Sequence, residues 1–377
     1  MILGIDATNI RGGGGLTHLT EILLNAEPSS HGFEKVIVWS NNDTLSKLPN
    51  LPWLVKKTHR WLNKSVFFSF LFQKQLLSKQ ATEERCTILF VPGGTFLGNF
   101  KHILSMSQNM LPFEKEESAR FTSLKTRLRF KILYYTQKKT FKKSDGIIFL
   151  THYAKNYIAK AIGLKNDFMI IPHGIKLSFV NSPKTQKDIS EYSFDNPFKL
   201  LYVSILNVYK HQWNVAEAIL KLRQEGYPVH LDFVGGSHKE SLQKLKNVLV
   251  KDKQNCLNYV GEIPYEELEN VYKKADAFVF ASSCENMPII LIEAMTSGLP
   301  ISSSNMGPMP EVLEDAGFYF DPLKVDDIYN SIKYMLESVE QRRIKSQKSY
   351  QKSINYTWKD CSDKTFEYFS KIAKKVK

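Results

Sequence analysis

The chain has 377 residues, enough for two domains of ordinary size, and 43% of them are hydrophobic and 24% charged, as in globular proteins. Its 19 glycines and 15 prolines are too few for a collagen-like or low-complexity chain. Four scattered cysteines without a CxxC motif argue against a disulfide scaffold or a cysteine zinc site. The net charge of +13 comes from the first half, because residues 1–190 carry +14 and residues 191–377 carry −1.

Short apolar runs alternate with amphipathic segments along the first half. We expect buried strands at residues 2–7, 35–40, 87–92, 103–107, 146–150 and 168–172. No apolar run approaches the ~18 residues of a membrane span. The opening MILGIDAT has neither a basic region nor a cleavage site, which makes a secretory signal an unfavoured interpretation.

A run of glycines, Gly12–Gly15, follows the first predicted strand and precedes an apolar helical segment. Gly13, Gly14 and Gly15 in such a turn let backbone N–H groups approach an anion at a helix N-terminus. The run does not match GxGxxG, and a flexible turn explains it as well. Both interpretations stay open at this point.

The densest basic segment lies between Glu117 and Asp145 and contains no acidic residue. Its nine cations are Arg120, Lys125, Arg127, Arg129, Lys131, Lys138, Lys139, Lys142 and Lys143. Apolar residues recur at steps of three and four, as on one face of a helix: Phe121, Leu124, Leu128, Ile132 and Tyr135. Such a helix either packs on a core or lies on an anionic membrane surface. The aromatic stretch 53–72 leaves the same choice for Phe67, Phe68 and Leu71.

A second set of elements begins after the polar stretch 182–196. We expect strands at residues 199–204, 229–235, 257–261, 277–282 and 299–304, with helices that include 213–225 and 265–274. This alternation predicts parallel sheets covered by helices, and two sets predict an α/β protein with two Rossmann-like domains facing a central cleft. The ligand is expected at the carboxyl ends of the strands. We also expect a terminal helix at residues 358–377.

Two glutamates, Glu285 and Glu293, stand eight residues apart around Pro288. If a helix begins near Met287, the N–H groups of Asn286, Met287 and Ile289 can take a phosphate. Acidic side chains beside a nucleotide commonly bind ribose hydroxyls. Glu293 lies in the apolar run IILIEAM, and burying an unpaired carboxylate is costly, which favours a functional role. Lys210, in the turn after residues 199–204, either faces the same phosphate or is a surface lysine.

Residues 260–321 resemble the donor-binding domain of retaining glycosyltransferases of family 4, which have the GT-B fold. The resemblance rests on VGEIPYEELENVYKKADAFVFASS, ENMPIILIEAMTSGLPISSS and GPMPEVLEDAGFYFDP, with weaker matches over nearly the whole chain. It implies an acceptor-binding domain at residues 1–185, a nucleotide-sugar-binding domain at 186–357 and a C-terminal helix, 358–377, that crosses back onto the first domain.

The resemblance also implies roles for individual residues. Glu293 would hold the ribose and Glu285 the donor sugar, while Lys210 and the amides after Glu285 would hold the diphosphate. The loop Gly13–Gly15 would approach the donor from the other domain. Two departures stand out: Ser204 and Ile205 replace the usual Gly-Arg, and Gln108 and Asn109 replace the usual His-Asp, so that one cation and one imidazole are missing.

The expected activity is transfer of a sugar from a UDP- or GDP-linked donor to a glycan hydroxyl, with retention and without a metal or cofactor. No Asp-x-Asp motif is evident, and front-face attack needs no carboxylate nucleophile. We expect a lipid-linked acceptor of the kind used in polysaccharide, O-antigen or capsule synthesis, and a peripheral position on the inner face of the cytoplasmic membrane. Arg120, Lys125, Arg127, Arg129 and Lys131 would contact that membrane or the acceptor.

Two other functions are compatible with the sequence. Nucleotide-sugar 2-epimerases share the two-domain fold and differ in their product. A basic nucleic-acid-binding protein is the second alternative, although no helix-turn-helix, zinc-finger or RNP pattern is present and nucleic acid is not the expected partner.

Overall fold

The computed structural model describes residues 1–376, and the chain forms two compact units. The first unit comprises Met1–Ser118, Thr122–Gly174 and the segment from Thr357 onward, and the second comprises Ala119–Phe121 and Ile175–Tyr356. The sequence predicts that the first domain ends at residue 185, whereas the chain leaves the first unit after Gly174. Each unit is built on one parallel sheet, which confirms the prediction of two Rossmann-like α/β domains.

The first unit contains seven parallel strands in the order β3-β2-β1-β4-β5-β6-β7. Their bounds are β1 Ile2–Asp6, β2 Lys35–Trp39, β3 Leu54–Lys57, β4 Ile88–Val91, β5 Ile103–Met106, β6 Gly146–Phe149 and β7 Asp167–Ile170. Six of them were predicted from apolar runs. The edge strand β3 was missed, because its sequence LVKK is only partly buried and carries two lysines.

Helices follow the strands of the first unit as expected for parallel pairing. They are α1 Gly13–Leu24, α2 Asn42–Lys47, α3 Val66–Phe72, α4 Ser78–Glu83, α5 Lys115–Ala119, α6 Leu124–Lys143 and α7 His152–Ile162. A π-helical turn, Gln73–Leu77, joins α3 to α4, and a 3₁₀ turn, Pro28–His31, precedes β2.

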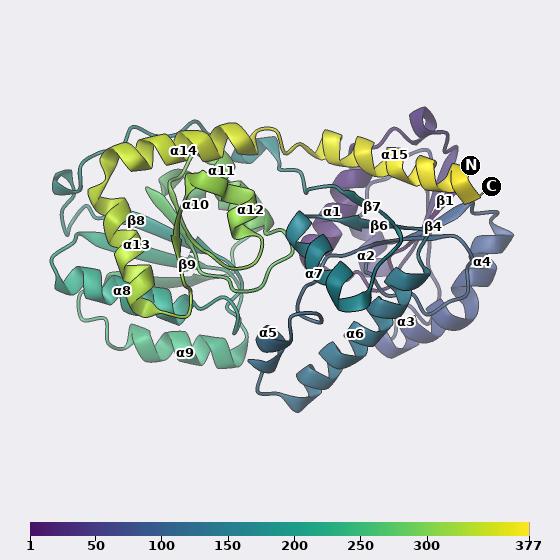
Figure 1. The fold of residues 1–377 in the computed structure, drawn as a ribbon, viewed down its shortest axis with the longest axis horizontal. Helices are drawn as coiled ribbons and strands as arrows, with labels where there is room; N and C mark the ends of the chain where they lie inside the picture. Colours follow the sequence, from purple (N-terminus) through teal and green to yellow (C-terminus); the bar gives the residue numbers. More distant parts are fainter. Residues whose placement is uncertain (377) are drawn as a thin grey trace. The chain divides into compact units, whose positions relative to one another are not determined.

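The last helix, α15 Trp358–Val376, packs on the first unit (Figure 1), as the fold prediction stated. The Phe369 ring lies 4.7 Å from the ring of Phe90 on β4, and the Ser362 hydroxyl donates a 2.8 Å hydrogen bond to the carbonyl of Ile22 on α1. The backbone at the start of α15 passes very close to Gly174. A Cβ added at Gly174 would lie only 2.3 Å from the backbone nitrogen of Trp358. Glycine is therefore required where the chain leaves this unit.

The second unit contains six parallel strands in the order β10-β9-β8-β11-β12-β13. Their bounds are β8 Phe198–Val203, β9 Val229–Val234, β10 Leu257–Gly261, β11 Ala277–Phe280, β12 Ile301–Ser304 and β13 Gly317–Phe320. The helices are α8 Gln212–Gln224, α9 Lys239–Leu249, α10 Leu268–Lys274, α11 Ile289–Thr296, α12 Met309–Leu313, α13 Val325–Glu337 and α14 Val339–Ser353. 3₁₀ turns lie at Leu177–Phe179, Ile189–Glu191, Tyr265–Glu267 and Glu314–Ala316.

Within residues 1–376, no helix combines the length and the apolar character needed to cross a bilayer.

Candidate functional site

The strand order of the second sheet reverses between β8 and β11, the two neighbouring central strands. Loops that leave the carboxyl ends of such strands run in opposite directions and leave a crevice where ligands bind in open α/β sheets. The loop after β8 carries Lys210 and the loop after β11 carries Glu285. The topology thus brings together two residues that the sequence separates by 75 positions.

Lys210 and Glu285 form an ion pair at this edge of the sheet, and both side chains are largely buried. The Ser282 hydroxyl donates a 2.6 Å hydrogen bond to the same Glu285 oxygen, Oε1. The Lys210 ammonium also lies 4.9 Å from the centre of the Phe280 ring and 5.3 Å from that of Tyr209. Cation and carboxylate are therefore held in fixed positions before any ligand arrives.

The residue after Lys210 adds a second polar contact between the two loops. The His211 Nε2 and Ser283 Oγ atoms lie 2.9 Å apart, and the Ser283 amide donates a 2.8 Å hydrogen bond to the Tyr209 carbonyl. His211 has a φ of +48° at the position before α8, a left-handed conformation that is uncommon outside glycine. Burial lowers its pKa to about 3, and the cations Arg120 and Lys244 act in the same sense. His211 is neutral at physiological pH.

The helix α11 begins at Ile289, two residues later than the expected start near Met287, and Pro288 occupies the N-cap position. Asn286 and Met287 lie buried in the loop that precedes it. The sequence prediction that the N–H groups of Asn286, Met287 and Ile289 bind a phosphate stays a prediction.

Glu293 lies in the second turn of α11 and is only 1% exposed. Its two carboxylate oxygens accept 3.0 Å hydrogen bonds from the hydroxyls of Tyr265 and Tyr272. Burial raises the pKa of Glu293 to about 7, although both tyrosines and the charge of Lys176 oppose the increase. The Glu293 carboxyl group therefore titrates near neutral pH. The tyrosine hydroxyls that donate to it are of the type that a ribose also presents.

The first sheet also reverses its strand order, between β1 and β4, and the glycine run follows β1. The helix α1 begins at Gly13, whose φ is +62°. A Cβ at Gly15 would lie 2.9 Å from Oε1 of Gln108, the side chain that follows β5. Gln108 also lies 3.3 Å from the Met106 sulfur, and the exposed Asn109 accepts a 3.1 Å hydrogen bond from the Leu111 amide. The first unit thus gathers the glycine run and Gln108.

A buried histidine pair lies close behind the glycine run in the first unit. The Nδ1 atoms of His18, on α1, and His173, beside the junction glycine, lie 3.0 Å apart. The Trp358 ring contacts both, with centroid distances of 5.8 and 5.9 Å. Burial lowers the pKa of His18 to about 3 and that of His173 well below its usual value. The two histidines are therefore uncharged. Their contacts link α1, the segment at Gly174 and α15.

The basic segment forms α6, and its apolar stripe, for which the sequence left core packing and membrane contact open, is exposed in the first unit. Leu124, Leu128, Ile132 and Tyr135 are 79%, 58%, 53% and 60% exposed. The helix packs instead through its other face, whose buried residues are Phe130, Gln137, Thr140 and Phe141. Polar bonding explains part of this choice, because the Thr140 hydroxyl accepts a 2.9 Å hydrogen bond from the Phe96 amide.

The predicted surface cations divide into two places. Lys125, Arg127, Arg129 and Lys131 lie exposed on α6. Arg120 lies outside that helix, in the short segment Ala119–Phe121 that belongs with the second unit. It lines a cavity of about 390 Å³ there, together with Val208, His211 and Lys244.

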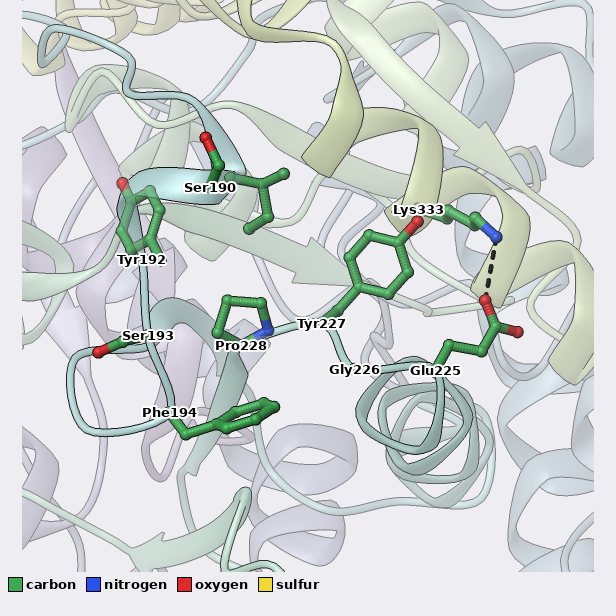
Figure 2. A pocket seen from close by; sticks show the side chains of 10 residues that line it. Ser190, Tyr192, Ser193, Phe194, Glu225, Gly226, Tyr227, Pro228 and Lys333 are labelled. Carbon is green, nitrogen blue, oxygen red and sulfur yellow. Dashed lines mark hydrogen bonds and ion pairs between the residues drawn. The ribbon is translucent and has the colours of Figure 1, made fainter.

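A larger hollow of about 760 Å³ lies elsewhere in the second unit (Figure 2). It is lined by the segment 189–194, the turn 225–228 before β9, and Lys333 on α13. These residues precede β8 and β9, so the hollow lies at the amino ends of these strands, whereas Lys210 and Glu285 follow the carboxyl ends. Volume alone therefore does not identify the functional edge of this sheet.

Several residues of the candidate site were not predicted. Ser282, Ser283, His211, Tyr265 and Tyr272 hold the predicted side chains in place. The pair Ser282-Ser283 directly before Cys284-Glu285 was a local signal, whereas the tyrosines reach Glu293 only through the tertiary fold. Among residues 1–376, no group of three or more His, Cys, Asp and Glu side chains is arranged to hold a metal ion.

The second unit is similar to a known protein family. Residues 184–352, within the second unit, match the family model described as glycosyl transferases group 1. The O-antigen chain mannosyltransferase B of Escherichia coli is 28% identical over 172 residues, which cover 45% of this chain and 45% of that protein. An uncharacterized glycosyltransferase of Methanocaldococcus jannaschii is 24% identical over 69% of this chain and 67% of its own length. The chain thus spans about half the length of the first of these relatives.

Solved structures share the fold over almost the whole chain. Anabaena HepE, in complex with UDP-glucose, superposes with a TM-score of 0.73 at 15% identity, covering 98% of this chain and 100% of HepE. The fold class expected from the sequence, two Rossmann-like domains of the GT-B type, is thereby confirmed.

Proposed function

We propose that the protein is a retaining glycosyltransferase that moves a sugar from a nucleotide-sugar to a hydroxyl of a glycan acceptor. The observation that carries the proposal is the Lys210–Glu285 pair at the switch point of the second sheet, inside the segment that matches group 1 glycosyl transferases. In this proposal Lys210 binds the diphosphate, Glu285 binds the donor sugar and Glu293 binds the ribose.

The chemistry asked of Lys210 is stabilisation of the leaving group. A departing nucleoside diphosphate gains negative charge, and a fixed cation beside it lowers the barrier without reorganisation at the moment of reaction. Lys210 is suited to this role because Glu285, Phe280 and Tyr209 hold its ammonium in place. The amides of Asn286, Met287 and Ile289 add N–H donors in the same proposal, and no metal is required.

The sugar side of the reaction falls to Glu285. Its carboxylate is already held by Lys210 and Ser282, so it serves as a fixed acceptor for sugar hydroxyls rather than as a nucleophile. Retention by two displacements needs a carboxylate close to the anomeric carbon, whereas front-face attack needs none. We therefore propose front-face transfer, in which a phosphate oxygen of the leaving group takes the proton of the acceptor hydroxyl.

The first unit provides the remaining groups of the proposal. In the proposal, Gly13, Gly14 and Gly15 let backbone N–H groups approach the donor. A side chain at Gly15 would also collide with Gln108. Gln108 and Asn109 would supply polar contacts to the donor sugar in place of an imidazole. HepE is seen in complex with UDP-glucose, which supports a uridine donor, with a guanosine donor as the alternative.

Thermal melting tests the donor proposal. The protein would be melted with UDP, GDP, UDP-glucose and GDP-mannose, each with EDTA and with Mg²⁺. A ligand at about 100 times its Kd adds about 2.7 kcal/mol to the free energy of unfolding. We expect stabilisation by one nucleotide class in EDTA. Stabilisation only with Mg²⁺ contradicts the metal-independent mechanism, and no stabilisation by any of the four contradicts the donor assignment.

For the acceptor we propose a lipid-linked glycan at an anionic membrane surface, in polysaccharide synthesis of the O-antigen kind. The exposed stripe Leu124, Leu128, Ile132 and Tyr135 supports this, because the same helix carries cations and no acidic residue. In this proposal the protein lies peripherally on the inner face of the cytoplasmic membrane.

Flotation with phosphatidylglycerol vesicles at low and high salt tests the membrane contact. We expect binding at low salt that Leu128→Asp abolishes. Val250→Asp, at an even more exposed apolar residue of the second unit, serves as the control and should leave flotation unchanged. Failure of the unmodified protein to float at low salt would overturn the membrane proposal and leave the donor site untouched.

A further inference from the structure

The hollow at the amino ends of β8 and β9 carries an inference beyond the transfer reaction, and it rests on the proposed function for its choice of ligand. We propose that this hollow is a second saccharide-binding site, which holds a neutral segment of a glycan chain away from the donor site. Its volume of about 760 Å³ falls in the range of small-molecule sites. All of its lining residues belong to the second unit.

Three aromatic rings contribute to the lining of the hollow. Tyr192, Phe194 and Tyr227 come from two separate segments and line the hollow around Pro228, as Figure 2 shows. Aromatic rings present large flat apolar faces, and a pyranose ring presents a face of C–H groups that packs on them. Phe194 is 57% exposed, so its ring is accessible to a ligand.

Each ring is fixed by a neighbour before a ligand binds. The Arg223 guanidinium lies 4.2 Å from the centre of the Phe194 ring, and its buried Nε and Nη1 atoms have no hydrogen-bond partner in the described chain. The Tyr192 ring meets Phe198 edge-on at 5.2 Å. The Tyr227 hydroxyl donates to a carboxylate oxygen of Glu337. Rings that are already ordered lose little conformational entropy on binding, which favours affinity.

The polar groups of the hollow fit a ligand with hydroxyls and no net charge. Glu225 and Lys333 form an ion pair at 3.0 Å, drawn as a dashed line in Figure 2, so the two charged lining residues balance each other. Ser190 and Ser193 add hydroxyls, and both are exposed. A nucleotide or an acidic lipid would find no surplus cation in this lining, whereas a neutral saccharide needs none.

The position of the hollow separates it from the transfer reaction. Its lining residues precede β8 and β9, and the Lys210–Glu285 pair follows β8 and β11, so the two sites lie at opposite ends of the same sheet. A glycan bound at the amino ends therefore does not block the donor site. In a protein that extends or modifies a polymer, such a site retains the chain near the enzyme between transfers.

Saturation-transfer NMR with three neutral hexasaccharides, maltohexaose, mannohexaose and chitohexaose, tests this inference in the presence of saturating nucleotide. Phe194→Ala removes the exposed ring, and Phe194→Trp restores an aromatic face. Tyr334→Ala, at a comparably exposed ring on α13, is the matched control. We expect at least one hexasaccharide to bind, about tenfold more weakly to Phe194→Ala, and without change to Phe194→Trp and Tyr334→Ala.

Three results would overturn the inference. They are no saturation transfer to any of the three sugars, equal transfer to the unmodified protein and Phe194→Ala, or preferred binding of an acidic oligosaccharide such as an alginate hexamer. Nucleotide-induced stabilisation, measured on the same samples, reports on the donor site separately. If no saccharide binds while the nucleotide still stabilises the protein, the second saccharide site is contradicted and the donor site is not.

Discussion

Replacing Glu293 by glutamine should raise stability and weaken nucleotide binding at the same time. The carboxylate is buried and its pKa is raised from 4.5 to about 7, so between these values the folded state holds a proton that the unfolded chain has released. The free energy of unfolding therefore falls as pH rises through this window, by about 2–3 kcal/mol between pH 5 and pH 8. Glutamine keeps the shape and still pairs with both tyrosine hydroxyls.

Urea unfolding at pH 5, 6, 7 and 8 measures the effect. The difference in unfolding free energy between Glu293→Gln and the unmodified protein should grow in favour of the variant by about 2–3 kcal/mol over this range. Glu269→Gln, at a partly exposed carboxylate on α10, is the control and should show a much smaller change. Parallel pH dependence of the unmodified protein and Glu293→Gln would refute the reasoning. At pH 8 the variant should also bind the nucleotide more weakly, because the proposed ribose acceptor is gone.

Two further changes test the packing of the first unit. Gly174→Ala should lower the free energy of unfolding by at least about 3 kcal/mol in urea titrations, because its Cβ would collide with the Trp358 backbone, whereas Gly12→Ala has open space and should have little effect. For His18 the folded pKa lies below the unfolded value of 6.5, so stability is lost as pH falls below 6.5. His18→Gln should remove about 2 kcal/mol of the loss between pH 7 and pH 5, and an unchanged acid-unfolding curve would contradict this.

The sequence predicted those parts of the molecule that short local patterns determine. Eleven strands follow from apolar runs, and the loops after two of these strands carry Lys210 and Glu285, whose site roles were inferred from the family resemblance. The edge strand β3 was missed because its lysines hide the pattern. The strand β13, Gly317–Phe320, lay inside the motif GPMPEVLEDAGFYFDP and was not separated from it.

Contacts between distant segments could not be predicted. Tyr265 and Tyr272 approach Glu293 because α10 and the 3₁₀ turn before it pack beside α11, and no spacing in the sequence reveals this. For α6, periodicity identified a helix but not the face that packs. The buried face contains Gln137 and Thr140, which satisfy their polar atoms in the loop around Phe96, and the more apolar face is left exposed.

The central claim, that the Lys210–Glu285 pair forms part of a nucleotide-sugar site, is tested most directly by calorimetric titration. Removing Lys210 alone would leave a largely buried carboxylate unpaired and destabilise the protein, so the double variant Lys210→Met/Glu285→Gln is preferable. The ion pair Lys273–Glu269 in the same unit, 3.9 Å apart and more exposed than Lys210–Glu285, provides the matched control variant Lys273→Met/Glu269→Gln.

The unmodified protein and both double variants would be titrated with the nucleotide-sugar that gives the largest stabilisation in melting. A charge-assisted contact to phosphate contributes about 1.5–3 kcal/mol, so the site variant should bind about 10- to 100-fold more weakly, and the control variant should bind as the unmodified protein does. Equal affinity of all three proteins, with the site variant folded, would contradict the account.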